Sequence, residues 1–121
     1  MSELADKTAE LLDKAFPLLR CKREHYVFFM GKKLFFDFYI PDLKVCIEVQ
    51  GQQHYQFVPF FHQVADSFRK QKYRDQLKTE WCAENNIIFI EVSGKSKHLT
   101  QDNLRNTILK AVRENSNGSA S

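Results

Sequence analysis

Residues 35–55, FFDFYIPDLKVCIEVQGQQHY, decide the fold of this chain. Two runs within this stretch, 35–40 and 45–49, are rich in aromatic and β-branched residues, which favour strands. Pro41 and Asp42 lie between the runs and are typical turn residues. The stretch therefore predicts two apolar strands joined by a tight turn.

Two acids interrupt these apolar strands, Asp37 in the first and Glu48 in the second. A carboxylate inside a buried strand is costly unless a partner compensates its charge. Two carboxylates on adjacent strands can converge on one cation, so we interpret Asp37 and Glu48 as ligands of Mg²⁺ or Mn²⁺, with the carbonyl of Val49 as a further oxygen ligand. A structural interpretation without a metal is also open for Asp37 taken alone, since a lone Asp within a strand is often a hairpin-edge or capping residue.

The residues that follow Glu48 extend the candidate site. Gln50 lies two positions on and hence on the same sheet face, where it can orient a water or a phosphate. His54 follows Gly51 beyond the strand end and is suited to act as a general base or proton shuttle near neutral pH. Asp75, in a later helical segment, is a candidate supporting acid.

The remaining sequence predicts a small α/β domain in the order α-β-β-β-α-β-α, with a four-stranded mixed sheet flanked by helices. We expect a single domain over residues 1–114 and a disordered tail over 115–121. The turn between the first two strands is placed at Gly31, Lys32 and Lys33. The expected elements are helix 2–15, strands 24–29, 35–40 and 45–49, a loop over 56–63, helix 66–85, strand 87–92 and a helix from 100 or 102 to 112.

Composition limits the class of protein. The chain has 121 residues, a formal net charge of +3 and three cysteines far apart in the sequence. That number and spacing argue against a disulfide framework or a zinc knuckle and favour a reducing compartment. No apolar run approaches membrane-spanning length, so we expect no membrane association and a cytoplasmic location.

Basic residues are concentrated outside the two strands that carry the acids. This arrangement suits a site that binds a polyanion through the basic residues and holds a cation against it with the acids. A phosphodiester polyanion, that is a nucleic acid, is the expected partner. The candidate nucleic-acid contacts are Lys33, Arg74, Lys78, Lys95, Lys97 and His98.

Four segments in this order resemble the Vsr-like branch of the PD-(D/E)XK nuclease superfamily, which includes repair endonucleases and phage homing endonucleases of the EDxHD type. The segments are 36–41 (FDFYIP), 47–55 (IEVQGQQHY), 73–82 (YRDQLKTEWC) and 87–92 (IIFIEV). The resemblance implies Asp37 as principal metal ligand, with His54 and Asp75 as the later His and Asp of the family. It also implies an acid from the first helix, for which Glu3, Asp6 and Glu10 compete, with a preference for Glu10.

The chain departs from the family pattern where the usual lysine is replaced by Gln50; Lys78 would supply the missing charge if its side chain reaches the site. The sequence thus predicts an Mg²⁺-dependent endonuclease acting on double-stranded DNA in a phage-infected or bacterial cell. A free-standing phage homing endonuclease is one form it could take, and a homodimer is one way to cut both strands. The alternatives are a repair or junction-resolving nuclease of the same fold, a catalytically inactive nucleic-acid-binding module and a purely structural phage protein.

Overall fold

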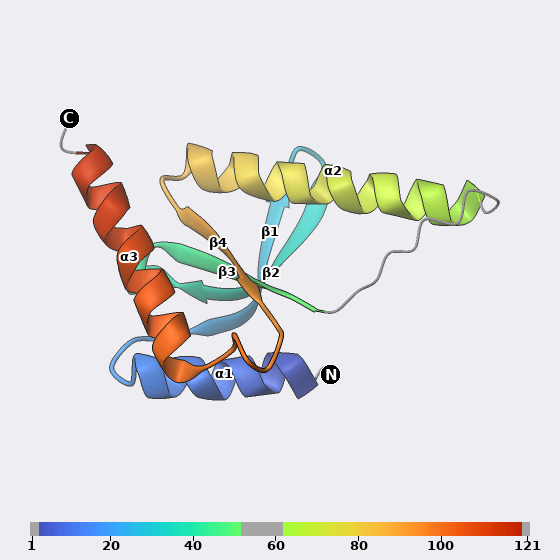
Figure 1. The fold of residues 1–121 in the computed structure, drawn as a ribbon. Helices are drawn as coiled ribbons and strands as arrows, with labels where there is room; N and C mark the ends of the chain where they lie inside the picture. Colours follow the sequence, from blue (N-terminus) through green and yellow to red (C-terminus); the bar gives the residue numbers. More distant parts are fainter. Residues whose placement is uncertain (1–2, 52–61, 120–121) are drawn as a thin grey trace.

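A four-stranded mixed sheet forms the centre of the molecule and helices cover both of its faces (Figure 1). The computed structural model describes residues 3–51 and 62–119. The elements are α1 (Glu3–Ala15), β1 (Lys22–Phe29), β2 (Lys32–Ile40), a 3-10 turn η1 (Pro41–Leu43), β3 (Val45–Gln50), α2 (His62–Glu84), β4 (Ile88–Ser93) and α3 (Gln101–Ser119). This order confirms the predicted α/β architecture.

The sheet order is β1-β2-β3-β4. β1 pairs antiparallel with β2, β2 antiparallel with β3, and β3 parallel with β4. The parallel pair needs a crossover connection, which is provided by the segment that contains α2. As a result, β3 lies inside the sheet while β1 and β4 form its two edges.

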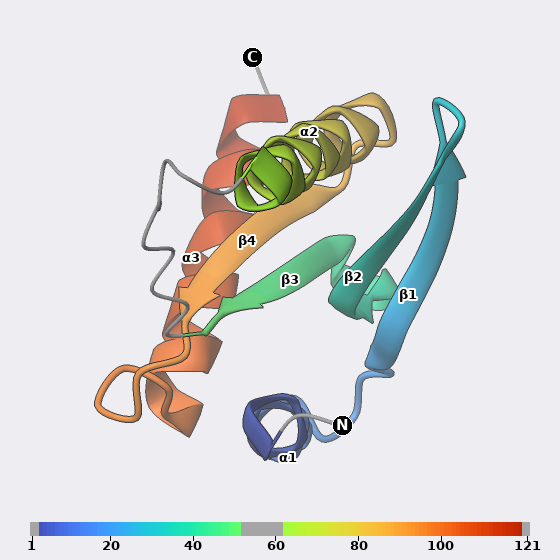
Figure 2. The ribbon, with the colours of Figure 1, turned by 90° about the vertical axis from the view of Figure 1, so that its right-hand side faces the viewer.

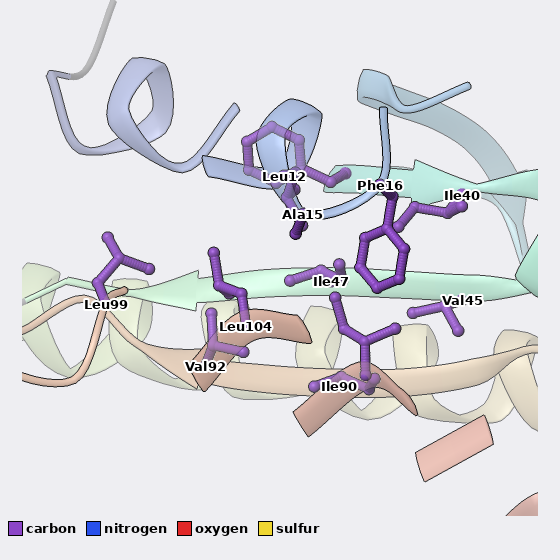
Figure 3. Close-up of a cluster of buried hydrophobic side chains, with 12 residues drawn as sticks. Leu12, Ala15, Phe16, Ile40, Val45, Ile47, Ile90, Val92, Leu99 and Leu104 are labelled. Atoms are coloured by element: carbon purple, nitrogen blue, oxygen red, sulfur yellow. The ribbon is translucent and has the colours of Figure 1, made fainter. Parts of the chain in front are cut away.

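One face of the sheet packs against α1 and α3 (Figure 2). The apolar side chains of this layer are shown in Figure 3, where Leu12 and Phe16 from the α1 region meet strand residues such as Ile47 and Ile90. Thr8, Leu12 and Ala15 are buried along one face of α1, whereas Leu4 and Leu11 of the same helix and Leu19 after it are partly buried.

α2 covers the opposite face, where Leu77 and Cys82 pack with Phe36, Cys46 and other residues of the sheet. Tyr73, Leu77 and Trp81 follow one another at helical spacing along α2 but differ in burial. Leu77 is buried and Trp81 is partly buried, but Tyr73 lies toward solvent because the N-terminal part of α2 extends past the sheet.

Three predicted boundaries require correction. The turn between β1 and β2 consists of Met30 and Gly31, both with positive φ (52° and 74°), as in a two-residue type I′ loop. Lys32 and Lys33 therefore begin β2, and Lys33 pairs with Phe28. α2 starts at His62 and α3 continues to Ser119, so the segment predicted as a disordered tail is helical through that residue. The predicted loop over 56–63 lies largely outside the described residues.

Candidate active site

Asp37 and Glu48 meet where strands β2 and β3 separate. The backbone pairing between these strands runs from Ile40 and Val45 to Phe38 and Ile47. Beyond that pair, the Asp37 N–H donates to Glu48 Oε2 at 3.1 Å and the Val49 N–H donates to Asp37 Oδ2 at 2.8 Å. Each carboxylate thus accepts a backbone hydrogen bond from the other strand, which compensates for the lost ladder bonds and holds the two acids side by side.

The same geometry directs a backbone carbonyl toward the acids. Within a strand, the N–H and C=O of one residue point to the same neighbouring strand. Because the Val49 N–H points to Asp37, the Val49 carbonyl lies on the Asp37 side of β3. The next residue points the other way, since the Gln50 carbonyl accepts the Gly94 N–H at 2.9 Å on the β4 side.

Lys78 reaches the carboxylate pair from α2. Its Nζ forms an ion pair with Glu48 Oε1, and both side chains are only 12% exposed. The ammonium also lies 5.6 Å from the centre of the Phe36 ring. Lys78 therefore brings a positive charge to the carboxylate pair from α2, an element distant in the sequence from β2 and β3.

Burial and the neighbouring acid raise the pKa of Glu48 from 4.5 to about 7. Desolvation is the main cause, followed by the hydrogen bond with the Asp37 carboxyl group, while Lys78 acts in the opposite direction. The charge of Lys78 thus only partly compensates the negative charge of the two carboxylates. A further cation beside Asp37 and Glu48 would stabilise their ionised forms.

A cavity of about 670 Å³ opens between the sheet and α2 at the carboxylate pair. It is lined by five of the predicted catalytic and metal-binding residues, Asp37, Glu48, Val49, Gln50 and Asp75, and by Lys78, a predicted nucleic-acid contact. Asp75 lies at the exposed rim, where its Oδ1 accepts a hydrogen bond from Gln71 Nε2 at 3.0 Å.

Glu10 does not join this site, and the preference for it over the other acids of the first helix is corrected. It lies on α1, which covers the opposite face of the sheet, and forms an exposed ion pair with Lys14 at 3.3 Å. The start of α1 comes closer to the cavity, because Leu4 Cδ2 lies 3.7 Å from the position that a Cβ at Gly51 would occupy. Gly51 lines the cavity, and Leu4 is therefore close to it. Among the three acids of the first helix, Glu3 is the one adjacent to Leu4 in the sequence.

The remaining predicted residues lie elsewhere. His54 is outside the described residues and its role stays a prediction. Lys33 is in the β1–β2 hairpin and Arg74 is on the exposed side of α2. Lys95 and Lys97 are exposed in the loop after β4, and His98 there contacts Ser93 Oγ through Nδ1 at 3.0 Å and lines a second cavity of about 240 Å³.

Sequence reasoning missed Glu91 as a site residue. Glu91 pairs in parallel register with Glu48, and it lines both the main cavity and the second one. A signal was present, because Glu91 is a single acid in an otherwise apolar strand, as Glu48 is. Lys72, Gln71 and Phe68 of α2 also line the main cavity and had no distinguishing signal in the sequence.

Across the described part of the chain, no group of three or more His, Cys, Asp or Glu side chains is arranged to hold a metal ion. The candidate ligand set is therefore two carboxylates and a backbone carbonyl. Such oxygen donors fit a hard cation, Mg²⁺ or Mn²⁺, that keeps water in its other positions.

Comparison with known proteins finds relatives among viral proteins of uncharacterised function. The chain is 50% identical over 56 residues to uncharacterized protein 307L of Invertebrate iridescent virus 6, a match covering 46% of this chain and 28% of the relative. It is 40% identical over 62 residues to protein 033L of Invertebrate iridescent virus 3 (51% and 32% of the two chains) and 43% identical over 63 residues to protein 094L of Frog virus 3 (51% and 41%).

The matches therefore span less than half the length of these curated relatives. No family model matches the chain, and no solved structure matches it. All three relatives are viral proteins, from two invertebrate iridescent viruses and a frog virus, and the phage-infected or bacterial cell stays a prediction. Within the described ranges, no helix combines the length and apolarity required to cross a lipid bilayer.

Proposed function

We propose that this chain is a metal-dependent DNA endonuclease with a PD-(D/E)XK-type core. The observation that carries the proposal is the pair of largely buried carboxylates, Asp37 and Glu48, brought together in the lining of a cavity by two separating strands. The element order α1-β1-β2-β3-α2-β4 is also the one that the resemblance implies. Whether the cut is made in repair, junction resolution or homing depends on the substrate and not on this pair.

Asp37, Glu48 and the Val49 carbonyl would hold Mg²⁺ or Mn²⁺. When bound there, the cation supplies charge neutralisation on a phosphate and activation of a water. The protein residues supply the rest: Lys78 balances the charge of Glu48, Gln50 orients water or phosphate from the cavity wall, and Asp75 contributes a rim carboxylate. His54 is the proposed general base or proton shuttle.

The test is the nicking of supercoiled DNA with Mg²⁺, Mn²⁺ or chelator, comparing the wild type with Asp37→Asn. We expect metal-dependent nicking by the wild type and its loss in the variant, with DNA binding retained. Asp42→Asn is the matched control, because Asp42 is an exposed aspartate in η1 away from the cavity. Equal nicking by Asp37→Asn and the wild type, or nicking unaffected by chelator, would contradict the proposal.

A second candidate function is nucleic-acid binding without cleavage. The specific observation in its favour is that Lys78 already neutralises part of the Glu48 charge while Gln50 stands where the family has lysine. In that case Mn²⁺ would not raise the melting temperature of the wild type, and neither the wild type nor Asp37→Asn would nick DNA, although both would bind it.

A further inference from the structure

The outer half of the β1–β2 hairpin presents an exposed aromatic face. Tyr26 is paired with Phe35 across the two strands, and Phe28 with Lys33. Directly opposed residues of an antiparallel pair point to the same face, so these four side chains form one surface. We call it the hairpin face.

The hairpin face lies opposite the side that packs on α2. Val27, Leu34 and Phe36 alternate with it along the strands and are buried in the α2 layer. In both ribbon views the hairpin tip lies beside α2 and at the far end of the sheet from α1, which leaves the other side uncovered by any helix (Figures 1 and 2).

The exposure of this face is unusually high for aromatic residues. Tyr26 is 48%, Phe28 63% and Phe35 51% exposed, and Met30 in the adjoining turn is 68% exposed. The rings of Tyr26 and Phe35 lie 5.2 Å apart, so the surface is continuous and not a set of scattered side chains. Contiguous exposed apolar surface of this kind marks a binding site.

The charge around the face selects the kind of partner. Between Tyr26 and Phe35 the charged residues are Lys32 and Lys33, and both are exposed. Arg23, at the other end of β1, is engaged in an ion pair with Asp6 at 2.9 Å. Lys33 lies within the hairpin face, and Lys32 adjoins it at the turn. A second copy of the chain docked on this face would bring like charges together, whereas a polyanion would neutralise them.

We propose that the hairpin face binds single-stranded nucleic acid by stacking unpaired bases on Tyr26, Phe28 and Phe35, with Lys32 and Lys33 contacting the phosphates. Aromatic side chains on an exposed sheet, interleaved with basic residues, provide a surface on which any base can stack through its π-face. This binding lies on a different part of the sheet from the cavity and requires neither metal nor cleavage.

The experiment is fluorescence anisotropy in the presence of chelator, with three labelled probes about 12 nucleotides long, a length within the range of single-strand sites. The probes are oligothymidylate, an abasic strand of the same length and charge, and a duplex. We expect the wild type to bind oligothymidylate at least about five-fold more tightly than the abasic strand, because the abasic strand retains phosphates but has no bases to stack.

The test variant is Phe28→Ala with Phe35→Ala, and the control is Leu18→Ala, which removes an apolar side chain that is 94% exposed and remote from the hairpin. The double variant should lose about ten-fold or more of its affinity for oligothymidylate and none for the abasic strand. Since both phenylalanines are more than half exposed, thermal melting should stay close to that of the wild type, and this is measured alongside.

Equal affinity for the base-bearing and abasic strands would overturn the proposal, as would unchanged binding by the double variant. A concentration-dependent dimer in sedimentation that the double variant abolishes, with nucleic-acid binding intact, would instead identify the face as a protein interface. All binding measurements are made in chelator, so they do not depend on whether the chain is a metal-dependent nuclease. Nicking activity, in turn, is no evidence that the hairpin face binds single strands.

Discussion

At the scale of single residues, Glu48 is the group on which the site depends. Its carboxylate accepts a backbone hydrogen bond from Asp37 and an ion pair from Lys78, while burial and the second acid raise its pKa to about 7. A group whose pKa is higher in the folded than in the unfolded state stabilises the fold at low pH and loses that contribution as the pH rises through the folded value.

We therefore expect the free energy of unfolding, measured in chelator, to fall between pH 4.5 and pH 8 by up to about 3 kcal/mol. The Glu48→Gln variant should lack this decline, because its amide does not ionise. Mg²⁺ added at pH 8 should restore stability in the wild type by about 2.7 kcal/mol at a hundred-fold excess over its Kd. Denaturant titrations at several pH values measure both effects, and stability that rises over this pH range would contradict the assignment.

Lys78 gives a second prediction at this scale. Removing one partner of a buried ion pair leaves the other charge uncompensated, at a cost of about 3–5 kcal/mol. Lys78→Met should therefore be destabilised at pH 8, and less so at pH 5, where Glu48 is protonated. The double variant Lys78→Met with Glu48→Gln should be more stable at pH 8 than Lys78→Met alone. A double-mutant cycle by chemical denaturation measures this coupling, and additive effects would show that the pair does not interact.

At the scale of the elements, α2 is the part that brings the basic side chains to the acids. Its packing depends on Leu77, which is 3% exposed, whereas Tyr73, one turn earlier, is 47% exposed. The helix leaves the sheet between these two residues, so the part of α2 that carries Lys78 is anchored and the earlier part projects into solvent.

Leu77→Ala should lower the free energy of unfolding by about 2–4 kcal/mol, because it leaves a cavity among Phe36, Cys46 and Cys82. Tyr73→Ala is the matched control on the same stripe and should change stability by less than about 1 kcal/mol. Thermal and urea denaturation of both variants test this difference. Equal losses of stability in the two variants would mean that α2 packs on the sheet at Tyr73 as well as at Leu77.

At the scale of the whole molecule, the distribution of charge sets the expected DNA path. Lys72 and Lys78 line the main cavity, and Glu91 separates it from the second cavity, beside which Lys95 and Lys97 are exposed. If a phosphate of a duplex lies at the carboxylate pair, we expect the duplex to run past the loop after β4, where Lys95 and Lys97 are exposed.

Replacing both Lys95 and Lys97 with glutamine should weaken duplex binding and reduce the slope of log K against log salt by about 2, since each phosphate contact contributes about 0.9. The control is Lys110→Gln with Arg113→Gln, which removes the same charge from the exposed side of α3. Anisotropy titrations from low to moderate salt give the slopes. Equal slopes for the two double variants would place the DNA path elsewhere.

The sequence by itself determined the order of the elements and the position of the carboxylate pair. Strand-forming composition and turn signals are local properties, so the apolar runs 35–40 and 45–49 on either side of Pro41 and Asp42 were enough to indicate two strands with Asp37 and Glu48 within them. The boundaries that failed, at Lys32, His62 and Ser119, are those where neither proline nor a clear change of period marks the end of an element.

Only the tertiary structure decided which distant residues share the site. Three features of the site depend on how the elements pack, which no local pattern encodes. They are the parallel register that sets Glu91 beside Glu48, the ion pair that Lys78 of α2 forms with Glu48, and the placement of Glu10 on the far face of the sheet. The same holds for the hairpin face, since alternation predicts two faces for β1 and β2 but not which one α2 covers. Local periodicity sets the side chains of one element relative to each other, whereas contacts between elements arise from burial of the whole chain.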